Sequence, residues 1–239
     1  MSDLEPKPPR PPNQPSRSAF SHYLPRLRRE FYQADAVIFW TLPVSRRARG
    51  WLSENFHAAF RELMLHASAR QGLHCPAYCL MPDHLHLVWM GLRRDSDQRN
   101  GMRFLRSALG PCLKPARFQH QPHDHVLKPK ERQRRAFSLA CADYVLLNPL
   151  KAGLVQEPGD WPYLGAVVPG YPRLDPFSAG YWPWFWKRYQ LAREPGIEKR
   201  ILPRAKWSSP VTTRSRERKF ALITSFRACE LITLVSSIT

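Results

Sequence analysis

The chain has 239 residues, of which 43% are hydrophobic, and its 37 Lys and Arg against 19 Asp and Glu give a net charge of +18. This apolar content suffices for one moderate domain, and the basic excess favours a polyanionic partner such as nucleic acid. No apolar run reaches the ~18 residues that a membrane-spanning helix needs, and the N-terminus lacks a signal-peptide core, so we expect a cytoplasmic protein without a membrane partner.

The first predicted elements follow a basic N-terminal arm. Residues 1–22 are rich in proline and charge and poor in core-forming side chains, a composition typical of disorder. Residues 35–44, "DAVIFWTLPV", form a compact run of β-branched and aromatic side chains that predicts a strand. Residues 52–72 place apolar side chains at helical spacing and end in Gly72, which predicts a helix.

A predicted hairpin and two more helices come next. The strands "HCPAYCL" and "HLHLVWMG" are joined around Met81-Pro82-Asp83, whose Pro and Asp favour a turn. Residues 99–110 predict a second helix, and "HVLK" a fourth strand. Residues 131–147 predict a third helix, which Pro149 should end because the residue before a proline is pushed away from helical angles.

The second hairpin strand carries His84 and His86. Because side chains alternate along a strand, both imidazoles are expected on one face, with Leu85 and Leu87 on the other. An antiparallel sheet with helices on one side would leave the histidines on the opposite, accessible face. Two imidazoles there form half of a metal site. An isolated His-x-His is nevertheless a weak motif, and two solvated polar residues are the simpler explanation.

The segment "DYVLLNPLKAGLV", residues 143–155, adds a second motif. Tyr144 and Asn148 lie four residues apart, so on a helix they project from the same face. The alternative is that Tyr144 packs in the core and Asn148 caps the helix end.

Together, "MPDHLHLVW" and "DYVLLNPLKAGLV" occur in an order and at a separation that resemble the single-tyrosine transposases of the His-hydrophobic-His nuclease superfamily, above all their REP-associated tyrosine transposase branch. The resemblance covers about residues 30–170. It implies an α+β, ferredoxin-like (RRM-like) fold: an antiparallel sheet with helices on one face and the catalytic tyrosine on a following helix. The expected organisation, after the arm, is a catalytic domain at 23–170, an aromatic extension at 171–195 and a basic tail at 196–239.

The resemblance also assigns roles to individual residues. His84 and His86 match the metal ligands, Asn148 the polar residue that completes the metal site, and Tyr144 the nucleophile. Nitrogen and oxygen ligands without a thiolate suit Mg²⁺ or Mn²⁺. Tyr144 would cleave and rejoin DNA through a 5′-phosphotyrosine intermediate. The expected partner is single-stranded or hairpin (REP-like) DNA, with association to the nucleoid when bound, and both monomer and homodimer remain open.

Several further residues are candidates for minor roles. Asp83 stands where many members of the family carry Asn, a departure that we expect not to touch the chemistry, and Asp124 is a candidate base. We expect one or two of the aromatic side chains in loops after the catalytic helix to be exposed and to stack on unpaired bases, while the rest form a satellite core. These side chains are Trp161, Tyr163, Trp182, Trp184 and Trp186.

Two other classes of protein are compatible with parts of the sequence. A non-catalytic RRM-like binder would share the fold but would need no tyrosine and asparagine beside a histidine pair. A structural zinc protein using Cys75 and Cys79 is less favoured, because residues four apart on a strand should place both thiols on one face rather than on a metal-gripping turn. His74, His120, His123 and His125 could add ligands, although a polar loop with several histidines is usually just solvated.

Overall fold

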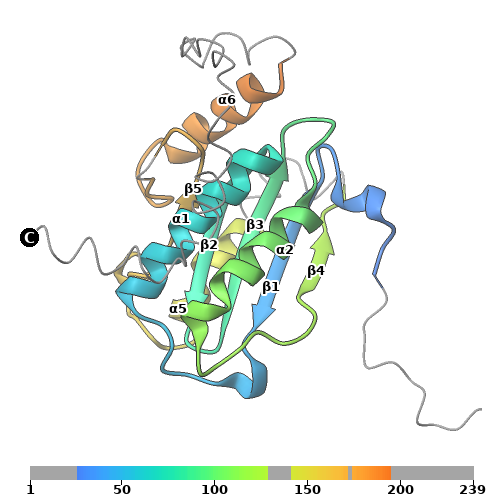
Figure 1. Cartoon of the computed structure of the whole chain (residues 1–239). Helices are drawn as coiled ribbons and strands as arrows, with labels where there is room; N and C mark the ends of the chain where they lie inside the picture. Colours follow the sequence, from blue (N-terminus) through green and yellow to red (C-terminus); the bar gives the residue numbers. More distant parts are fainter. Residues whose placement is uncertain (1–25, 129–140, 172–173, 195–239) are drawn as a thin grey trace, which may run out of the picture.

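The computed structural model describes residues 26–128, 141–171 and 174–194 (Figure 1). The predicted N-terminal arm, the basic tail and residues 131–140 of the predicted third helix lie outside these ranges. Within them, no helix combines the length and apolar character needed to cross a bilayer.

A 5-stranded antiparallel sheet forms the centre of the fold, with the strand order β4-β1-β3-β2-β5. The strands are β1 (Val37–Pro43), β2 (Leu73–Met81), β3 (His84–Gly91), β4 (His123–Val126) and β5 (Leu164–Val167). Helix α1 (Glu54–Gln71) connects β1 to β2, and α2 (Gln98–Leu109) lies between β3 and β4. The first four strands and two helices therefore form two interleaved β-α-β units, and the predicted ferredoxin-like α+β fold is confirmed.

Helices α1 and α2 cover one face of the sheet (Figure 1). Both begin at a side-chain cap: Ser53 accepts a hydrogen bond from the Phe56 N–H, and Asp97 accepts one from the Asn100 N–H. Helix α1 ends at Gly72, whose φ of 59° is left-handed. The main core lies between these helices and alternate residues of the strands, among them Ile38, Trp40, Leu42, Leu85, Leu87 and Trp89.

The sequence had suggested that the opposite face of the sheet is open to solvent, but the structure shows that it is covered. Helices α4 (Asp143–Leu146), α5 (Asn148–Lys151) and α6 (Tyr181–Arg193) follow the histidine hairpin, and a second core forms between this face, α4 and α6. Strands β2 and β3 are apolar on both faces and almost wholly buried, so both faces need cover. The second core comprises Val37, Ala77, Cys79, Met81, Val88, Met90, Val145, Leu146, Phe185 and Trp186, with other buried residues.

The third helix differs from its prediction. Cys141 and Ala142 form a π-helical turn that leads into α4, and the helix is interrupted at Leu147 rather than ended by Pro149. Pro149 lies in the first turn of α5, where its missing N–H removes no hydrogen bond. The Leu147 N–H still donates to the Asp143 carbonyl at 2.8 Å, so the chain continues helically to Lys151.

Strand β2 contains an irregularity that separates the two cysteines. Its register shifts against β3 between His74 and Ala77, and against β5 between Cys75 and Tyr78. Cys75 therefore joins the main core and Cys79 the second core, on opposite faces, contrary to the strict alternation assumed from the sequence. The described 3₁₀ turns are η2 (Arg29–Tyr32), η3 (Ser45–Arg47), η4 (Pro111–Leu113) and η6 (Pro158–Asp160).

Candidate active site

The two histidines of β3 lie side by side on the sheet face that α4 and α6 cover. Their Nε2 atoms are 2.9 Å apart, and the ring centroids are separated by 4.5 Å at an interplanar angle of 81°. His86 is only 4% exposed, because Phe39 of β1 stacks on it at a centroid distance of 5.2 Å. The expectation of two solvent-facing imidazoles is therefore wrong for His86.

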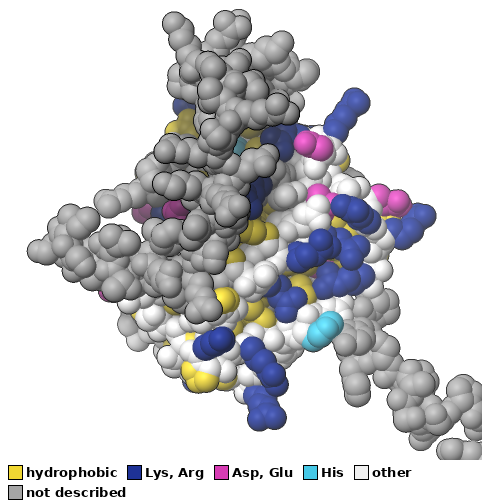
Figure 2. Space-filling view, in the orientation of Figure 1, with side chains coloured by type: hydrophobic (Ala, Val, Ile, Leu, Met, Phe, Trp, Pro, Cys, Tyr) yellow, Lys and Arg dark blue, Asp and Glu magenta, His cyan; other side chains and the backbone are white. Residues whose placement is uncertain are grey.

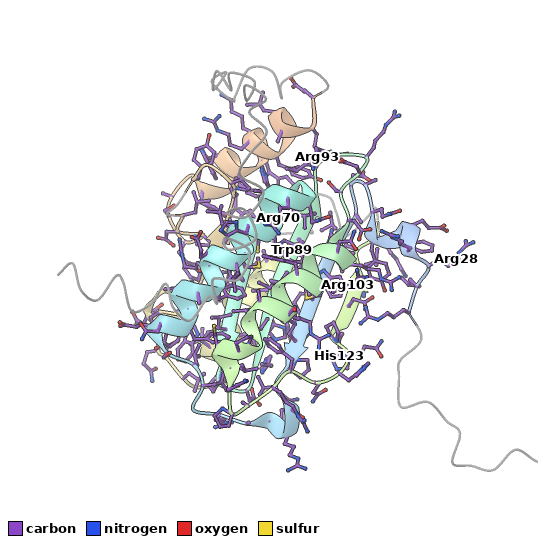
Figure 3. All side chains as sticks on the ribbon, in the orientation of Figure 1. Arg28, Arg70, Trp89, Arg93, Arg103 and His123 are labelled. Atoms are coloured by element: carbon purple, nitrogen blue, oxygen red, sulfur yellow. The ribbon has the colours of Figure 1, made fainter. Side chains whose placement is uncertain are left out.

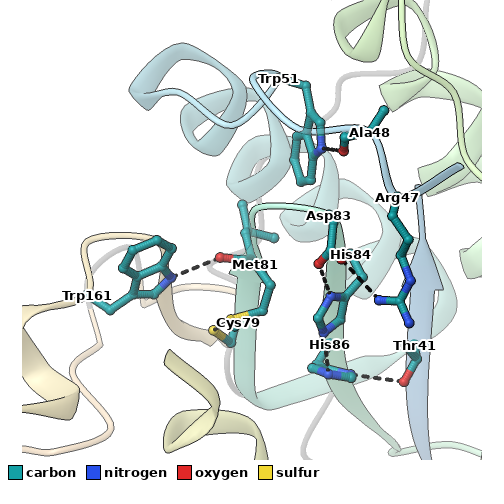
Figure 4. A network of polar contacts seen from close by, with 11 residues as sticks. Thr41, Arg47, Ala48, Trp51, Cys79, Met81, Asp83, His84, His86 and Trp161 are labelled. Carbon is teal, nitrogen blue, oxygen red and sulfur yellow. Dashed lines mark hydrogen bonds and ion pairs between the residues drawn. The ribbon is translucent and has the colours of Figure 1, made fainter. Parts of the chain in front are cut away.

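Each histidine is held through its Nδ1 atom (Figure 4). His84 Nδ1 lies 2.6 Å from Asp83 Oδ1, and His86 Nδ1 lies 2.9 Å from the Thr41 hydroxyl. Arg47 donates to the other oxygen of Asp83 at 3.1 Å. Burial opposes ionisation of Asp83, but the hydrogen bond from His84 and the charge of Arg47 outweigh it and lower the pKa of the carboxyl group. Asp83 therefore contacts the site directly, through His84.

The polar contacts determine which nitrogen atoms remain for a ligand. A carboxylate only accepts hydrogen bonds, so His84 Nδ1 donates to Asp83, and a neutral His84 ring would then carry its lone pair on Nε2. Burial, with the neighbouring His84 and Arg47, lowers the pKa of His86 to about 3, so its ring is neutral. If the Thr41 hydroxyl accepts a hydrogen bond from His86 Nδ1, the lone pairs of His84 Nε2 and His86 Nε2 face each other across 2.9 Å.

Three arrangements relieve that repulsion. The Thr41 hydroxyl donates to His86 Nδ1 while His86 Nε2–H donates to His84, or a doubly protonated His84 ring donates Nε2–H to His86, or a cation lies between the two Nε2 atoms. Two nitrogen ligands about 2.1 Å from one ion and at roughly a right angle lie about 3 Å apart. The spacing of the histidine pair therefore fits a single divalent ion.

Tyr144 lies against this pair. The centroid of its ring is 5.6 Å from that of His86 and also 5.6 Å from that of Phe39, in edge-to-face contacts. The side chain is 43% exposed, which excludes the alternative that Tyr144 is a core residue. Lys151 of α5 places its Nζ atom 5.3 Å from the centre of the Tyr144 ring. The structure thus brings a half-exposed tyrosine, two imidazoles and a cationic side chain together.

Asn148 lies one turn after Tyr144 but points its amide along the helix. Its Nδ2 donates to the Tyr144 carbonyl at 3.4 Å, as a residue at a helix junction often does. Within the described ranges, no three His, Cys, Asp or Glu side chains form a cluster of metal-ligand type. The role of Asn148 as a third ligand stays a prediction.

Four residues of the site were given no role from the sequence: Phe39, Thr41, Arg47 and Lys151. Phe39 and Thr41 reach the site because β1 pairs with β3 in a register that sets Thr41 opposite His86 and Phe39 opposite Val88. A single threonine inside the apolar run "DAVIFWTLPV" was the available signal for this strand. Arg47 follows the strand in η3, and its position depends on the hairpin turn that carries Asp83.

Other candidates lie away from the site. Asp124 pairs with Trp40 across β1 and β4, accepts a hydrogen bond from Tyr32 at 2.6 Å, and so belongs to the opposite face of the sheet, where it cannot act as a base for Tyr144. Three of the five aromatic residues that were expected in loops belong to α6, and none of the five is fully exposed. Trp186 is buried, while Trp161, Tyr163, Trp182 and Trp184 are half-buried against the cores.

Comparison with known proteins gives two relatives in sequence. No protein-family model matches the chain. It is 22% identical over 136 residues to the REP-associated tyrosine transposase of Escherichia coli (strain K12), covering 56% of this chain and 79% of the relative. It is 24% identical over 149 residues to a putative REP-associated tyrosine transposase of Haemophilus influenzae, covering 57% and 82%. These relatives confirm the resemblance predicted from the two motifs.

A solved structure is also similar. It is a REP-associated tyrosine transposase bound to a REP hairpin, 22% identical, with a TM-score of 0.48 over 59% of this chain and 82% of that chain.

Proposed function

We propose that this distant relative of the REP-associated tyrosine transposases is a DNA strand-cleaving and strand-transferring enzyme that uses Tyr144 as its nucleophile. The observation that carries the proposal is the contact between the exposed ring of Tyr144 and His86, whose Nε2 atom converges with that of His84. The names of both sequence relatives agree with this activity.

The chemistry needs few groups. The phenolic oxygen of Tyr144 attacks a backbone phosphorus, and the bond from phosphorus to the leaving 3′ oxygen breaks. The phenol gives up its proton in this attack, and the leaving 3′ oxygen takes up a proton to become a free hydroxyl, while the 5′ end is linked to Tyr144. Attack by a hydroxyl on the phosphotyrosine reverses these changes and rejoins DNA, so no nucleotide is consumed. Lys151 adds a positive charge beside the phosphate that Tyr144 would attack.

His84 and His86 would hold one Mg²⁺ or Mn²⁺ ion through their Nε2 atoms, with Asn148 as the third protein ligand. Asn148 Nδ2 donates to the Tyr144 carbonyl, so its Oδ1 is the amide atom that remains as a ligand. Bound there, such an ion would neutralise charge on the scissile phosphate. Asp83 and Thr41 would orient the two rings, as hydrogen-bond partners of metal-ligating histidines commonly do.

The proposed substrate is a short DNA hairpin with an unpaired flank that contains the cleavage site. The net charge of +18 supports binding to a polyanion, and one related structure is of a transposase bound to a REP hairpin. The Tyr144 side chain is half-exposed but lies against a sheet face. A phosphate in a rigid DNA duplex cannot easily approach it there, so we expect the cleaved DNA strand to be unpaired.

The decisive experiment is incubation of the whole chain with end-labelled hairpins carrying single-stranded flanks, with Mn²⁺, with Mg²⁺ and with a chelator. We expect a covalent protein–DNA adduct at the 5′ end of one fragment, only with metal. An RRM-like binder without activity would retain the DNA but form no adduct with any metal or flank, and that result would reject the proposal.

A further inference from the structure

A row of arginines crosses the face of the molecule that α1 and α2 form, on the other side of the sheet from Tyr144. Arg99, Arg103 and Arg106 occupy positions i, i+4 and i+7 of α2, so they share one stripe of the helix. The α2 sequence "QRNGMRFLRSAL" contains no acidic residue. Figure 2 shows Lys and Arg side chains gathered over this face, and Figure 3 places Arg103 on it together with Arg70 of α1. We call these four arginines the α2 face.

Three of the four guanidinium groups are held over aromatic rings. Arg99 lies 5.5 Å from the centre of the Tyr32 ring, Arg106 lies 5.9 Å from that of Phe118, and Arg70 lies 5.0 Å from that of Phe104. Arg106 also donates to the carbonyl of His120 at 3.0 Å and to that of Gln119. An arginine that is already held in place loses less side-chain freedom when it binds an anion. The guanidinium groups of the α2 face are therefore already positioned before a ligand binds.

The neighbouring carboxylates are already engaged elsewhere. Asp97 caps α2 and pairs with Arg29 at 2.7 Å, Asp95 pairs with Arg93 at 3.1 Å, and Asp124 binds Tyr32. Across the described part of the chain, no carboxylate forms an ion pair with Arg70, Arg99 or Arg103. Their positive charge is left for a partner.

The pattern fits the backbone of a DNA duplex better than unpaired bases. The stripe from Arg99 to Arg106 is about 10 Å long, close to three successive rises of ~3.4 Å between phosphates of one strand along the duplex axis. Unpaired bases stack on exposed aromatic rings, whereas the rings of the α2 face lie beneath the guanidinium groups, and Tyr32 is fully buried. Such a surface contacts phosphates and carries no base recognition.

We propose that the α2 face is a second DNA-binding surface, which holds the phosphate backbone of the paired stem while the unpaired flank of the same molecule reaches Tyr144. This proposal rests on the proposed function. A single DNA can contact both faces by passing around the β4 edge, because β4 is the outermost strand of the sheet on that side and lies beside α2 (Figure 1). The stem then sets where along the flank Tyr144 cuts.

The test compares the double variant Arg99→Gln/Arg103→Gln with the charge-matched control Arg94→Gln/Lys187→Gln, whose residues are exposed and lie outside the α2 face. Both are made in the Tyr144→Phe background, and the affinity for a blunt DNA stem is measured by fluorescence anisotropy at several salt concentrations. We expect the double variant to bind the stem roughly tenfold more weakly, while the control changes far less. The slope of log affinity against log salt concentration should decrease by the equivalent of about two phosphate contacts. Equal affinities and slopes in the two variants would overturn the proposal.

Two further measurements keep the result interpretable. Arg103→Glu alone changes an exposed residue and reverses its charge, so it tests the surface even if loss of Arg99 disturbs the packing on Tyr32. With Tyr144 intact, the Arg99→Gln/Arg103→Gln protein should form the adduct with a short stemless strand at the wild-type rate and lose cleavage of the stem-bearing substrate at low DNA concentration. Absence of any adduct from the wild-type chain would reject the proposed function, yet leave the anisotropy result standing. An equal loss of affinity for polyglutamate would show a general anion surface and overturn the assignment to DNA.

Discussion

Asp83 and His84 are neighbours in sequence and in space, with Asp83 Oδ1 2.6 Å from His84 Nδ1. The second oxygen of Asp83 is held by Arg47, from a 3₁₀ turn in which Arg46 and Arg47 both have left-handed backbone angles, with φ of 58° and 53°. Residues other than glycine rarely adopt this conformation, and it is often found at functional sites. The Val44 N–H anchors the turn by donating to the Asp83 carbonyl at 2.9 Å. A strained turn thus supports one ligand of the proposed metal.

From this contact we predict that Asp83→Ala weakens binding of Mn²⁺ by about 10–100-fold, because His84 loses the partner that fixes its ring and its tautomer. Electron paramagnetic resonance of free Mn²⁺, titrated with protein in the absence of DNA, measures this directly. Asp83→Asn keeps an acceptor oxygen and should retain most of the affinity. An unchanged Mn²⁺ affinity in Asp83→Ala would mean that this contact does not support the metal.

Tyr144→Phe should abolish the covalent adduct and leave DNA affinity almost unchanged, since it removes only the attacking oxygen. The side chain is 43% exposed and its ring contacts are retained, so the free energy of unfolding should change by no more than about 0.5 kcal/mol. Gel analysis of the adduct and urea unfolding check the two parts. A normal adduct yield from this variant would assign the nucleophile to another residue.

His86→Ala should lose metal-dependent cleavage and also destabilise the fold. The ring is 4% exposed, stacked on Phe39 and hydrogen-bonded to Thr41, so its removal leaves a cavity and an unpaired hydroxyl. We expect the free energy of unfolding to fall by about 1–3 kcal/mol. His84→Ala, at a more exposed ring, should cost less stability for a similar loss of cleavage. Cleavage by both variants in limiting Mn²⁺ would place the metal elsewhere.

Asn148→Ala should reduce cleavage less than either histidine variant, because water can replace one amide oxygen at a metal. Its hydrogen bond to the Tyr144 carbonyl is long, 3.4 Å, so the loss of stability should be about 1 kcal/mol or less. The dependence of the cleavage rate on Mn²⁺ concentration, compared with that of His84→Ala, is the measurement. A variant that unfolds instead would identify Asn148 as a structural cap.

The stability of the fold should fall as the pH is lowered from about 6.5 to about 4. Burial lowers the pKa of His74 to about 4, and burial with the neighbouring Arg61 does the same for His57. Within this window the unfolded chain binds protons that the folded chain excludes, so the free energy of unfolding decreases, and the contribution of these two groups levels off below the folded pKa. Urea unfolding at several pH values gives the slope. His74→Leu should make it shallower, and the exposed His120→Leu should not.

Local patterns predicted the two halves of the candidate site but not what holds them. Alternation and helical spacing, which are properties of short segments, drew attention to His84, His86 and Tyr144, and the resemblance of the two motifs to a transposase family supplied their expected roles. Thr41 and Phe39 depend on the pairing of β1 with β3, which lie more than forty residues apart, and no local pattern contains that register. Cys75 and Cys79 were misplaced because the irregularity around Pro76 breaks strict alternation.

The cover on the second face was missed for a different reason. Pro183 and the crowded aromatics of "GYWPWFWKRYQ" indicated a loop, yet Pro183 falls in the first turn of α6, where a missing N–H costs nothing. Phe185 and Trp186 of the same helix are buried against the sheet. Only the apolar character of both faces of β2 and β3 signalled that such a cover was needed.

Strand β3 lies at the centre of the sheet, paired with β1 on one side and β2 on the other, while Tyr144 lies in α4, just before the interruption of the helix at Leu147. Opening β3 requires breaking two ladders at once, so its amides should be among the slowest in the protein to exchange hydrogen, and those of α4 much faster. The proposed active site is thus divided between a rigid central strand and a helical segment that opens more easily. Any rearrangement between the proposed attack and rejoining would therefore involve Tyr144, while His84 and His86 would keep the positions that the sheet gives them.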